Sequence, residues 1–292
     1  MSTTLNTISL RPMVLSDMPD LMRLKNAESW NQTEQDWAFL INQNQHYCLV
    51  ACNGELIVGT VTAMKYGNNL AWIGMMLVAA AFRGQGISKL LLNAIIEKLQ
   101  YCNAIKLDAT TAGIPVYTKL GFTAEYEICR MTTPALSFDK KAQTDNSNYV
   151  IQPVNDSNIN EVSALDHHFY GINRSELFQF LMKQENHNCW CLTQDNSLRG
   201  YVFCRIGSKH LQIGPLQAKS TAEAKILLIK VLQNISGKPV LVDVLMEQYE
   251  LIDWLISIGF VAQRSFMRMY LKNNISTKQL ENQFLIAGPE LG

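Results

Sequence analysis

The chain has 292 residues, 48% of them hydrophobic, so it is long enough to form two domains that each bury a core. Its 25 Lys and Arg residues balance 25 Asp and Glu residues and neither half is basic, which excludes a nucleic acid or an anionic membrane as a partner held by overall charge. No run approaches the ~20 apolar residues of a membrane span, and the first residues do not resemble a signal peptide, so we expect a cytoplasmic protein. Most of the seven cysteines lie in apolar, strand-like segments, as reduced core residues do, and they predict no metal site.

Strands and helices alternate through the first half of the chain. The predicted strands cover residues 8–13, 46–52, 56–65, 70–79 and 105–109, and a last strand ends at Met131. Ser16 looks like the cap of a first helix with Pro19 in its first turn, and further helices are predicted over residues 35–41, 87–99 and 114–120. Asn53-Gly54 predicts a tight hairpin turn between the second and third strands.

The stretch from residue 70 to residue 99 carries the most specific pattern. Residues 70–82 are uncharged, which suits a strand buried on both faces of a largely parallel sheet, and the following helix has an apolar stripe. Between them, the turn Arg83-Gly84-Gln85-Gly86-Ile87-Ser88 predicts free backbone N–H groups at a helix N-terminus, which is a phosphate site. The turn is neither a P-loop nor a dinucleotide fingerprint, because it lacks the Lys-Ser/Thr end of the first and the glycine spacing of the second. The alternative is an ordinary glycine-containing turn.

The second half of the chain repeats the first. Ile73-Gly74 recurs as Ile213-Gly214 at an offset of 140 residues, whereas Gly121-Phe122 and Arg130-Met131 recur as Gly259-Phe260 and Arg268-Met269 at an offset of 138. Matches that keep both order and distance indicate a tandem duplication. The sequence therefore predicts one domain over residues 1–135, a polar linker over 136–148 and a second domain over 149–292.

The two copies differ where a phosphate would bind. In the second copy, residues 217–223 follow the strand without a glycine, and Ser220 with Glu223 predicts a capping box. Side chains would then occupy the helix N–H groups that face an anion in the first copy. We therefore expect an anion site in the first copy alone.

Several motifs resemble those of the GNAT superfamily, the acyl-CoA-dependent N-acyltransferases. Residues 83–88 are similar to its R/Q-x-x-G-x-G/A motif, with Ser88 in the last position and Ala80 where a proline is common. Residues 106–122, KLDATTAGIPVYTKLGF, look like the signature of a bacterial subgroup with Thr111 in place of a proline. Residues 213–216 (IGPL) and 288–292 (GPELG) match the degenerate second domain and the tail of that subgroup. The resemblance implies an α/β (α+β) fold of two tandem GNAT-like domains, each a mixed central sheet flanked by helices.

The resemblance also implies a site for acetyl-CoA. The pyrophosphate would lie on the loop Arg83, Gly84, Gln85, Gly86, Ile87 and Ser88, and the pantetheine arm would pair with the backbone of Leu77 and Val78. Thr110, Gly113 and Tyr117 would complete the coenzyme-binding set. Two strands that splay apart, here residues 70–79 and 105–109, offer unpaired backbone groups to such an arm, and Gly74 is the expected bulge where the splay starts.

Tyr117 matches the tyrosine that many members of the superfamily use as general acid toward the leaving CoA thiolate. The alternative is an aromatic residue that only packs under the short helix. Leu255 occupies this position in the second copy, next to the retained Gly259-Phe260, which favours the catalytic interpretation.

The general base is less well defined. We expect Glu34 to take this role, with Asp36 and a proton path through water as alternatives, because this region walls the acceptor pocket in similar proteins. Asp108 is a further candidate, but Asp243 stands at the equivalent point of the second copy and favours a structural role for both. Trp30 and Trp37 are candidate pocket-lining residues, although each could equally belong to the core.

Taken together, the motifs predict transfer of an acetyl group from acetyl-CoA to the amine of a small molecule by direct attack, in a monomer or homodimer without a metal. The alternatives are a non-catalytic acyl-CoA-binding or regulatory protein and a protein N-acetyltransferase. The last nine residues, 284–292, are apolar, and we expect them to dock on the first domain or between the two domains.

Overall fold

The computed structural model describes residues 8–135, 148–184, 188–235, 237–275 and 279–292. The predicted linker lies outside the described residues except for residue 148. The first half of the chain forms, in order, β1 (Ile8–Pro12), α1 (Met18–Ala27), α2 (Glu34–Asn44), β2 (Cys48–Asn53), β3 (Leu56–Tyr66), β4 (Leu70–Val78), α3 (Ile87–Lys98), β5 (Ala104–Thr110), α4 (Ile114–Lys119) and β6 (Thr123–Thr133).

The second half follows the same succession and ends with one extra strand. Its elements are β7 (Tyr149–Pro153), α5 (Ile159–Tyr170), α6 (Ser175–Met182), β8 (Trp190–Gln194), β9 (Ser197–Ile206), β10 (Leu211–Ala218), α7 (Thr221–Asn234), β11 (Val240–Leu245), α8 (Tyr249–Ser257), β12 (Val261–Lys272) and β13 (Gln283–Leu285). In the described ranges, no helix is both long and apolar enough to cross a membrane.

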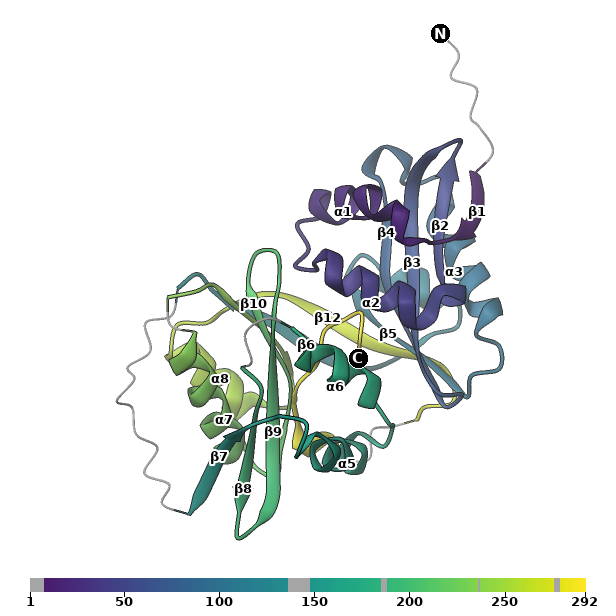
Figure 1. Cartoon of the computed structure of the whole chain (residues 1–292). Helices are drawn as coiled ribbons and strands as arrows, with labels where there is room; N and C mark the ends of the chain where they lie inside the picture. Colours follow the sequence, from purple (N-terminus) through teal and green to yellow (C-terminus); the bar gives the residue numbers. More distant parts are fainter. Residues whose placement is uncertain (1–7, 136–147, 185–187, 236, 276–278) are drawn as a thin grey trace.

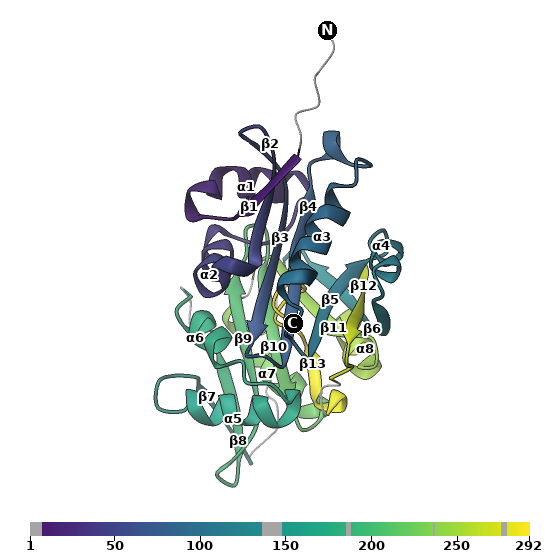
Figure 2. The same ribbon diagram turned by 90° about the vertical axis from the view of Figure 1, so that its right-hand side faces the viewer.

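The thirteen strands of the described residues form one sheet, in the order β1-β2-β3-β4-β5-β12-β6-β11-β13-β10-β9-β8-β7 (Figure 1). The expectation of a largely parallel sheet is wrong, because only β4–β5 and β10–β11 are parallel among the described pairs. β4 is nevertheless buried on both faces. Its alternate residues pack into two hydrophobic cores, one with α1 and α2 and the other with α3, which cover opposite faces of the first-half strands (Figure 2).

The first helix begins differently from the prediction. α1 starts at Met18 with Pro19 in its first turn, as expected, but its N-cap residue is Asp17 and not Ser16, and no side chain caps the helix by a hydrogen bond. The Asp17 carboxylate accepts a hydrogen bond of 2.9 Å from the backbone N–H of Val14 and pairs with Arg11. A carboxylate can serve both partners at once, which a serine hydroxyl does less well.

The predicted splay of β4 and β5 is present. The two strands pair from Leu70 opposite Ala104 to Ile73 opposite Leu107, and no described strand pairs with that edge of β4 beyond Ile73. The bulge lies at Met75 instead of Gly74: Met75 has a left-handed backbone (φ +49°), and the register with β3 shifts beside it. The buried hydroxyl of Thr60 donates a hydrogen bond of 2.7 Å to the Met75 carbonyl and so fixes this bend.

β6 and its equivalent β12 each cross to the other half of the sheet. β12 lies between β5 and β6 and runs antiparallel to both, and β6 pairs in turn with β11. The first-half β5 is therefore extended by a second-half strand, and the second-half β11 by a first-half strand. The proposed division at 136–148 thus separates two sequence repeats that share one sheet.

Two buried ion pairs fasten this exchange. Arg268 on β12 binds both carboxylate oxygens of Asp108 on β5, at 2.8 and 2.9 Å. Arg130 on β6 binds both oxygens of Asp243 on β11, at 2.7 Å each. The side chains of all four residues are at most 3% exposed. The recurrence of Arg and Asp in both repeats therefore reflects reciprocal pairing between the halves.

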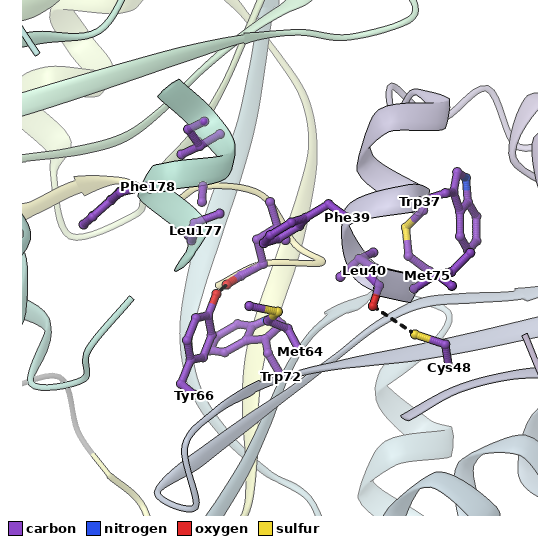
Figure 3. Packing of buried hydrophobic residues seen from close by; sticks show 14 of the residues in the cluster. Trp37, Phe39, Leu40, Cys48, Met64, Tyr66, Trp72, Met75, Leu177 and Phe178 are labelled. Atoms are coloured by element: carbon purple, nitrogen blue, oxygen red, sulfur yellow. Dashed lines mark hydrogen bonds between the residues drawn. The ribbon is translucent and has the colours of Figure 1, made fainter. Parts of the chain in front are cut away.

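A hydrophobic core also joins the two halves. It combines side chains of α1, α2 and β2–β4 with side chains of α5, α6, β8 and β9. Phe39 on α2 stacks on Phe180 on α6, with ring centroids 4.1 Å apart. Figure 3 shows part of this core, in which Trp37, Phe39 and Leu40 come from α2.

The segment 284–292 lies buried between the halves, as Figures 1 and 2 show for the end marked C. On the first-half side, the Trp72 indole donates to the Pro289 carbonyl at 2.9 Å and the Tyr66 hydroxyl donates to the Leu291 carbonyl at 2.5 Å. On the second-half side, Arg205 pairs with the Glu290 carboxylate at 2.5 Å. The predicted docking of this segment between the two domains is confirmed.

Two equivalent glycines make room for the same segment. A methyl group added at Gly74 would lie 2.7 Å from Cα of Glu290, and one added at Gly214 would lie 2.1 Å from the carbonyl oxygen of Ile286. Such distances are shorter than packed atoms allow. The recurring Ile-Gly motif therefore marks where the segment passes against each repeat.

Candidate active site

The predicted phosphate loop lies exposed at the N-terminus of α3. Gly84 and Gly86 have left-handed backbones, with φ of +77° and +81°, which explains why both are glycines. A methyl group added to either would meet no atom within 4 Å, so the space in front of the loop is open. No side chain caps α3 at Gly86. The first-turn N–H groups and the positive end of the helix dipole are thus free to bind an anion.

Arg83 connects this loop to the end of β4. Its Nε donates to the Val78 carbonyl at 3.0 Å, and its guanidinium pairs with Glu28. Leu77 and Val78 belong to the part of β4 that has separated from β5 and pairs with β3 alone among the described strands. Loop and open strand edge therefore adjoin one another.

The equivalent helix end of the second half is closed. The Ser220 hydroxyl accepts from the backbone N–H of Glu223 at 3.3 Å, so the predicted cap is confirmed. In a full capping box, the glutamate side chain also accepts from the backbone N–H of the cap residue. Here the buried Glu223 carboxylate instead accepts from Arg199 at 2.7 Å and from the Ser220 hydroxyl at 3.0 Å. A carboxylate already lies at this helix N-terminus.

A cavity of about 100 Å³ lies where β4 and β5 separate. Both repeats and the 284–292 segment line it, because the strand exchange brings β6 and β12 to this point. The lining residues include Met75, Thr110 and Tyr117 from the first half, Arg264 and Phe266 from the second, and Pro289 with Glu290. Residues of both halves therefore form the cavity.

Tyr117 lies on α4 and lines this cavity. Burial raises the pKa of its phenol to about 12, so the hydroxyl keeps its proton across the neutral pH range. The ring packs edge-on against Phe122 with centroids 5.9 Å apart, and a methyl group added at Gly113 would lie 2.9 Å from it. Gly113 is thus needed to admit the ring. Tyr117 therefore packs against Phe122 and is also one of the residues that line the cavity.

The carboxylates named from the sequence lie in different surroundings. Glu34 is exposed in the first turn of α2 and is not among the residues that line the cavity. Asp36 is buried, accepts from the backbone N–H of Thr33 at 2.7 Å and pairs with Arg205. Asp108 lines the cavity but is held by Arg268, and burial raises its pKa against the effect of that arginine. The buried, bidentate pair with Arg268 agrees with the structural role favoured for Asp108.

Of the two tryptophans, Trp30 lines the cavity and Trp37 is fully buried in the core. Sequence reasoning missed Gln32 and Glu290, which also line the cavity and contact each other: the Gln32 amide donates to the Glu290 carboxylate at 2.9 Å. Their spacing in the chain gives no signal of this contact. The available signal was the apolar composition of residues 284–292, from which their burial was predicted.

Comparison with known proteins agrees with this geometry. An acetyltransferase (GNAT) family model matches residues 13–122, and an acetyltransferase (GNAT) domain model matches residues 162–285. The chain is 26% identical over 245 residues to the Bacillus subtilis protein named uncharacterized N-acetyltransferase YitH, covering 82% of this chain and 83% of that one. It is 23% identical over 267 residues to the holothin acyltransferase of a Pseudoalteromonas species, covering 90% and 88%.

Solved structures share the tandem fold. A Pyrococcus horikoshii protein described as "Putative Acetyltransferase" matches with a TM-score of 0.82 at 20% identity, over all of this chain and 98% of that one. A tandem GNAT protein from the clavulanic acid biosynthesis pathway matches with a TM-score of 0.62 at 13% identity, over 92% and 100%. The chain thus carries two GNAT domains in tandem and belongs to the GNAT superfamily of acetyltransferases.

Proposed function

We propose that this acetyltransferase moves an acetyl group from acetyl-CoA to the amine of a small molecule, at one site per chain. The observation that carries the proposal is the alignment of three features: the open N-terminus of α3, the unpaired edge of β4, and the cavity lined by Tyr117. A phosphate chain, an amide-bearing arm and a reacting thioester need these features in that order.

The residues present fit the coenzyme. The loop from Arg83 to Ser88 would hold the pyrophosphate through backbone N–H groups, because its glycines leave the space in front of it open. Leu77 and Val78 would pair with the pantetheine arm, and Thr110 with Gly113 would border the thioester end near Tyr117. Acetyl-CoA supplies an activated acyl thioester.

Tyr117 is the proposed general acid. The neutral amine nitrogen attacks the thioester carbonyl carbon, a C–N bond forms, the C–S bond breaks, and the sulfur leaves with the electron pair of that bond. The Tyr117 hydroxyl, protonated because its pKa is about 12, gives its proton to this sulfur. The proton lost by the amine passes to water, from which Tyr117 is reprotonated. The backbone N–H of Val78 or a neighbour on the open edge of β4 is the proposed donor to the oxyanion.

Glu290 is the carboxylate that the cavity offers to the acceptor amine. It lines the cavity, lies against Gly74 on β4 and is held by Arg205 and Gln32. Both oxygens of this carboxylate already accept hydrogen bonds, from Gln32 and from Arg205, so the role we propose for Glu290 is to position the amine. We therefore place Glu290 beside the acceptor, where the sequence suggested Glu34.

The size of the cavity favours a small acceptor. About 100 Å³ is less than an engineered apolar cavity of roughly 150 Å³ that binds benzene, and here Trp30 and Pro289 form part of the wall. One sequence relative is named for holothin, and that name does not refer to a protein acceptor. A small-molecule amine agrees with both observations.

Release of free CoA thiol from acetyl-CoA, measured against a panel of amines with the products identified by mass spectrometry, tests the proposal. The variant Tyr117→Phe is expected to lower kcat by about 10² to 10⁴ and to leave the CoA dissociation constant unchanged, because only proton donation is lost. Tyr101→Phe is the matched control, since that side chain is 81% exposed. Wild-type turnover by Tyr117→Phe on a verified acceptor would reduce Tyr117 to a packing residue. Absence of any N-acetylated product would contradict the proposal itself.

A further inference from the structure

On the exchanged strands β6 and β12, two arginines with the same charge, Arg130 and Arg264, lie directly opposite each other. Between β6 and β12, Arg268 lies opposite Tyr126 and Arg264 lies opposite Arg130. Arg268 and Arg130 are equivalent residues of the two repeats, 138 positions apart, and Arg264 and Tyr126 are 138 positions apart as well. The two pairs are therefore equivalent by the internal duplication and differ in one side chain.

The side chains of the first pair, Arg268 and Tyr126, form a hydrogen bond, whereas those of the second pair, Arg130 and Arg264, cannot. Arg268 donates to the Tyr126 hydroxyl at 2.6 Å while it holds Asp108. Arg130 instead faces a second guanidinium, which has no acceptor atom. Like charges directly opposite each other on neighbouring strands destabilise a sheet. An anion between or beside these two arginines would remove the conflict.

Arg264 has no anion of its own among the residues that the structure describes. Its side chain makes no ion pair or hydrogen bond there, and its Nε is buried without a partner. Its guanidinium lies over the ring of Phe266, 5.3 Å from the centroid, and that of Arg130 lies 5.0 Å from the same centroid. Burial and the charge of Arg130 both lower the pKa of Arg264. Arg264 is half-buried, whereas the fully buried arginines at this centre, Arg130, Arg205 and Arg268, each pair with a carboxylate.

Arg264 belongs to the wall of the acceptor cavity. A bulge between Ala262 and Arg264 shifts the register of β12 just before it, and bulges redirect the side chains that follow them. Gln32 lines the same cavity, and its Oε1 is buried without a hydrogen-bond donor. The cavity thus contains an unpaired cationic donor and an unpaired acceptor beside the Glu290 carboxylate.

We propose that Arg264 binds the carboxylate of the acetyl acceptor, and that the acceptors are amino acids and related amino carboxylates whose amine lies toward Gln32 and Glu290. A guanidinium matches a carboxylate through two parallel hydrogen bonds, and an amine supplies the N–H groups that Gln32 and Glu290 accept. The inference rests on the proposed function, since it names the acceptor of that reaction. It assigns a specificity role to the second repeat, because β12 carries Arg264.

The test compares each acceptor with its carboxamide. CoA release is measured for the common α-amino acids, β-alanine and 4-aminobutyrate, each beside its carboxamide, with ethanolamine phosphate as a second anion. For the best acid, we expect kcat/KM to exceed that of its amide by about 10- to 100-fold, the range of a hydrogen bond to a charged group. In Arg264→Gln this ratio is expected to fall to about 1 through a higher KM, with the CoA dissociation constant unchanged. Equal rates for acid and amide with the wild-type protein, or a preference for the phosphate, would overturn the carboxylate assignment.

A second variant separates binding from folding. Arg264→Tyr copies the equivalent residue Tyr126 and gives Arg130 a hydroxyl partner, so its melting temperature is expected to equal or exceed that of the wild type while the acid-to-amide ratio is lost. Arg264→Lys keeps the charge without the planar fork and is expected to retain part of the ratio. Arg23→Gln removes a surface arginine and is the neutral control. An unchanged ratio in both Arg264→Gln and Arg264→Tyr would overturn the proposal.

A binding measurement keeps this inference distinct from the proposed function. In the presence of CoA, thermal shifts with the same acids and amides are expected to show stabilisation by the acids in the wild type and none in Arg264→Gln. If the acids bind in this way but no acetyl product forms, the proposed function fails and the carboxylate site stands. If the acids stabilise wild type and Arg264→Gln equally, the carboxylate site is refuted whatever the turnover.

Discussion

The N-termini of α3 and α7 are equivalent positions in the two repeats, but the first is open and the second is closed by side chains. At α3, glycines hold the loop open and no side chain caps the helix. At α7, Ser220 caps the helix and the Glu223 carboxylate lies beside it, bound to Arg199. A helix N-terminus attracts an anion in either case, and the second copy satisfies this with its own side chain. We therefore expect one anion site per chain, at the N-terminus of α3.

The centre of the sheet shows the opposite behaviour. There the two copies keep the same residues, because Arg268–Asp108 and Arg130–Asp243 hold the exchanged strands in equivalent ways. Side chains required for the joint sheet are alike in both copies, and side chains near the ligand differ. In both repeats the arginines and aspartates at the centre of the sheet therefore serve the fold.

The largest expected effect comes from closing the open helix end. Gly86→Glu adds a side chain and a negative charge at the phosphate position and forces a left-handed backbone on a non-glycine residue, so CoA binding is expected to be abolished. Thr221→Glu places the same charge in the first turn of α7 and is expected to leave CoA affinity unchanged. Calorimetric titration measures both. Wild-type affinity in Gly86→Glu would mean that the loop is not the phosphate site.

The next effect tests the equivalence of the two ion pairs. Asp108→Asn and Asp243→Asn each leave a buried arginine without its counter-charge, which costs about 3–5 kcal/mol of the free energy of unfolding. We expect similar losses for the two variants in urea titrations, because both pairs are bidentate and buried. Asp20→Asn, in an exposed pair with Arg23, is the control and is expected to cost less than about 1 kcal/mol. A small loss at either buried site would break the equivalence.

A smaller effect concerns the equivalent glycines. Gly74→Ala brings a methyl group against Glu290 and is expected to cost about 1–3 kcal/mol of the free energy of unfolding, as overpacking does. Gly214→Ala is expected to cost more, because the clash with the Ile286 carbonyl is closer and φ at Gly214 is +144°. Thermal or urea unfolding gives the ranking. An unchanged free energy of unfolding in Gly74→Ala would show that Glu290 can move away from β4 at little cost.

Much of the fold could be predicted from local patterns. Apolar periodicity, the Asn53-Gly54 turn and the glycines of residues 83–88 act over a few neighbouring residues, so the strands, helices and open loop of the first half follow from them. The strand exchange could not be predicted. If β6 stayed beside β5 and β12 beside β11, the strands and the buried Arg and Asp residues would have the same sequence pattern. The two arrangements differ only in which strand pairs with which, and local patterns carry no information about that.

The candidate site divides in the same way. The loop at residues 83–88 and the pair Thr110 and Tyr117 each lie within a short motif, and the resemblance of these motifs to the GNAT superfamily named them as site residues. Glu290, Gln32 and Arg264 reach the cavity through the 284–292 segment, the chain before α2 and the exchanged strand β12. Their meeting depends on tertiary pairing over more than 200 residues, as the Gln32–Glu290 separation of 258 positions illustrates. Glu34 was named because it is near in sequence to that wall, yet it lies in the exposed first turn of α2.

The number of CoA molecules bound per chain tests the central claim most directly. Calorimetric titration of the full chain with CoA is expected to give one site per chain, because α3 is open and α7 is capped by Ser220. The Gly86→Glu variant is expected to give none. Two sites in the wild-type chain, or one site remaining in Gly86→Glu, would contradict the account.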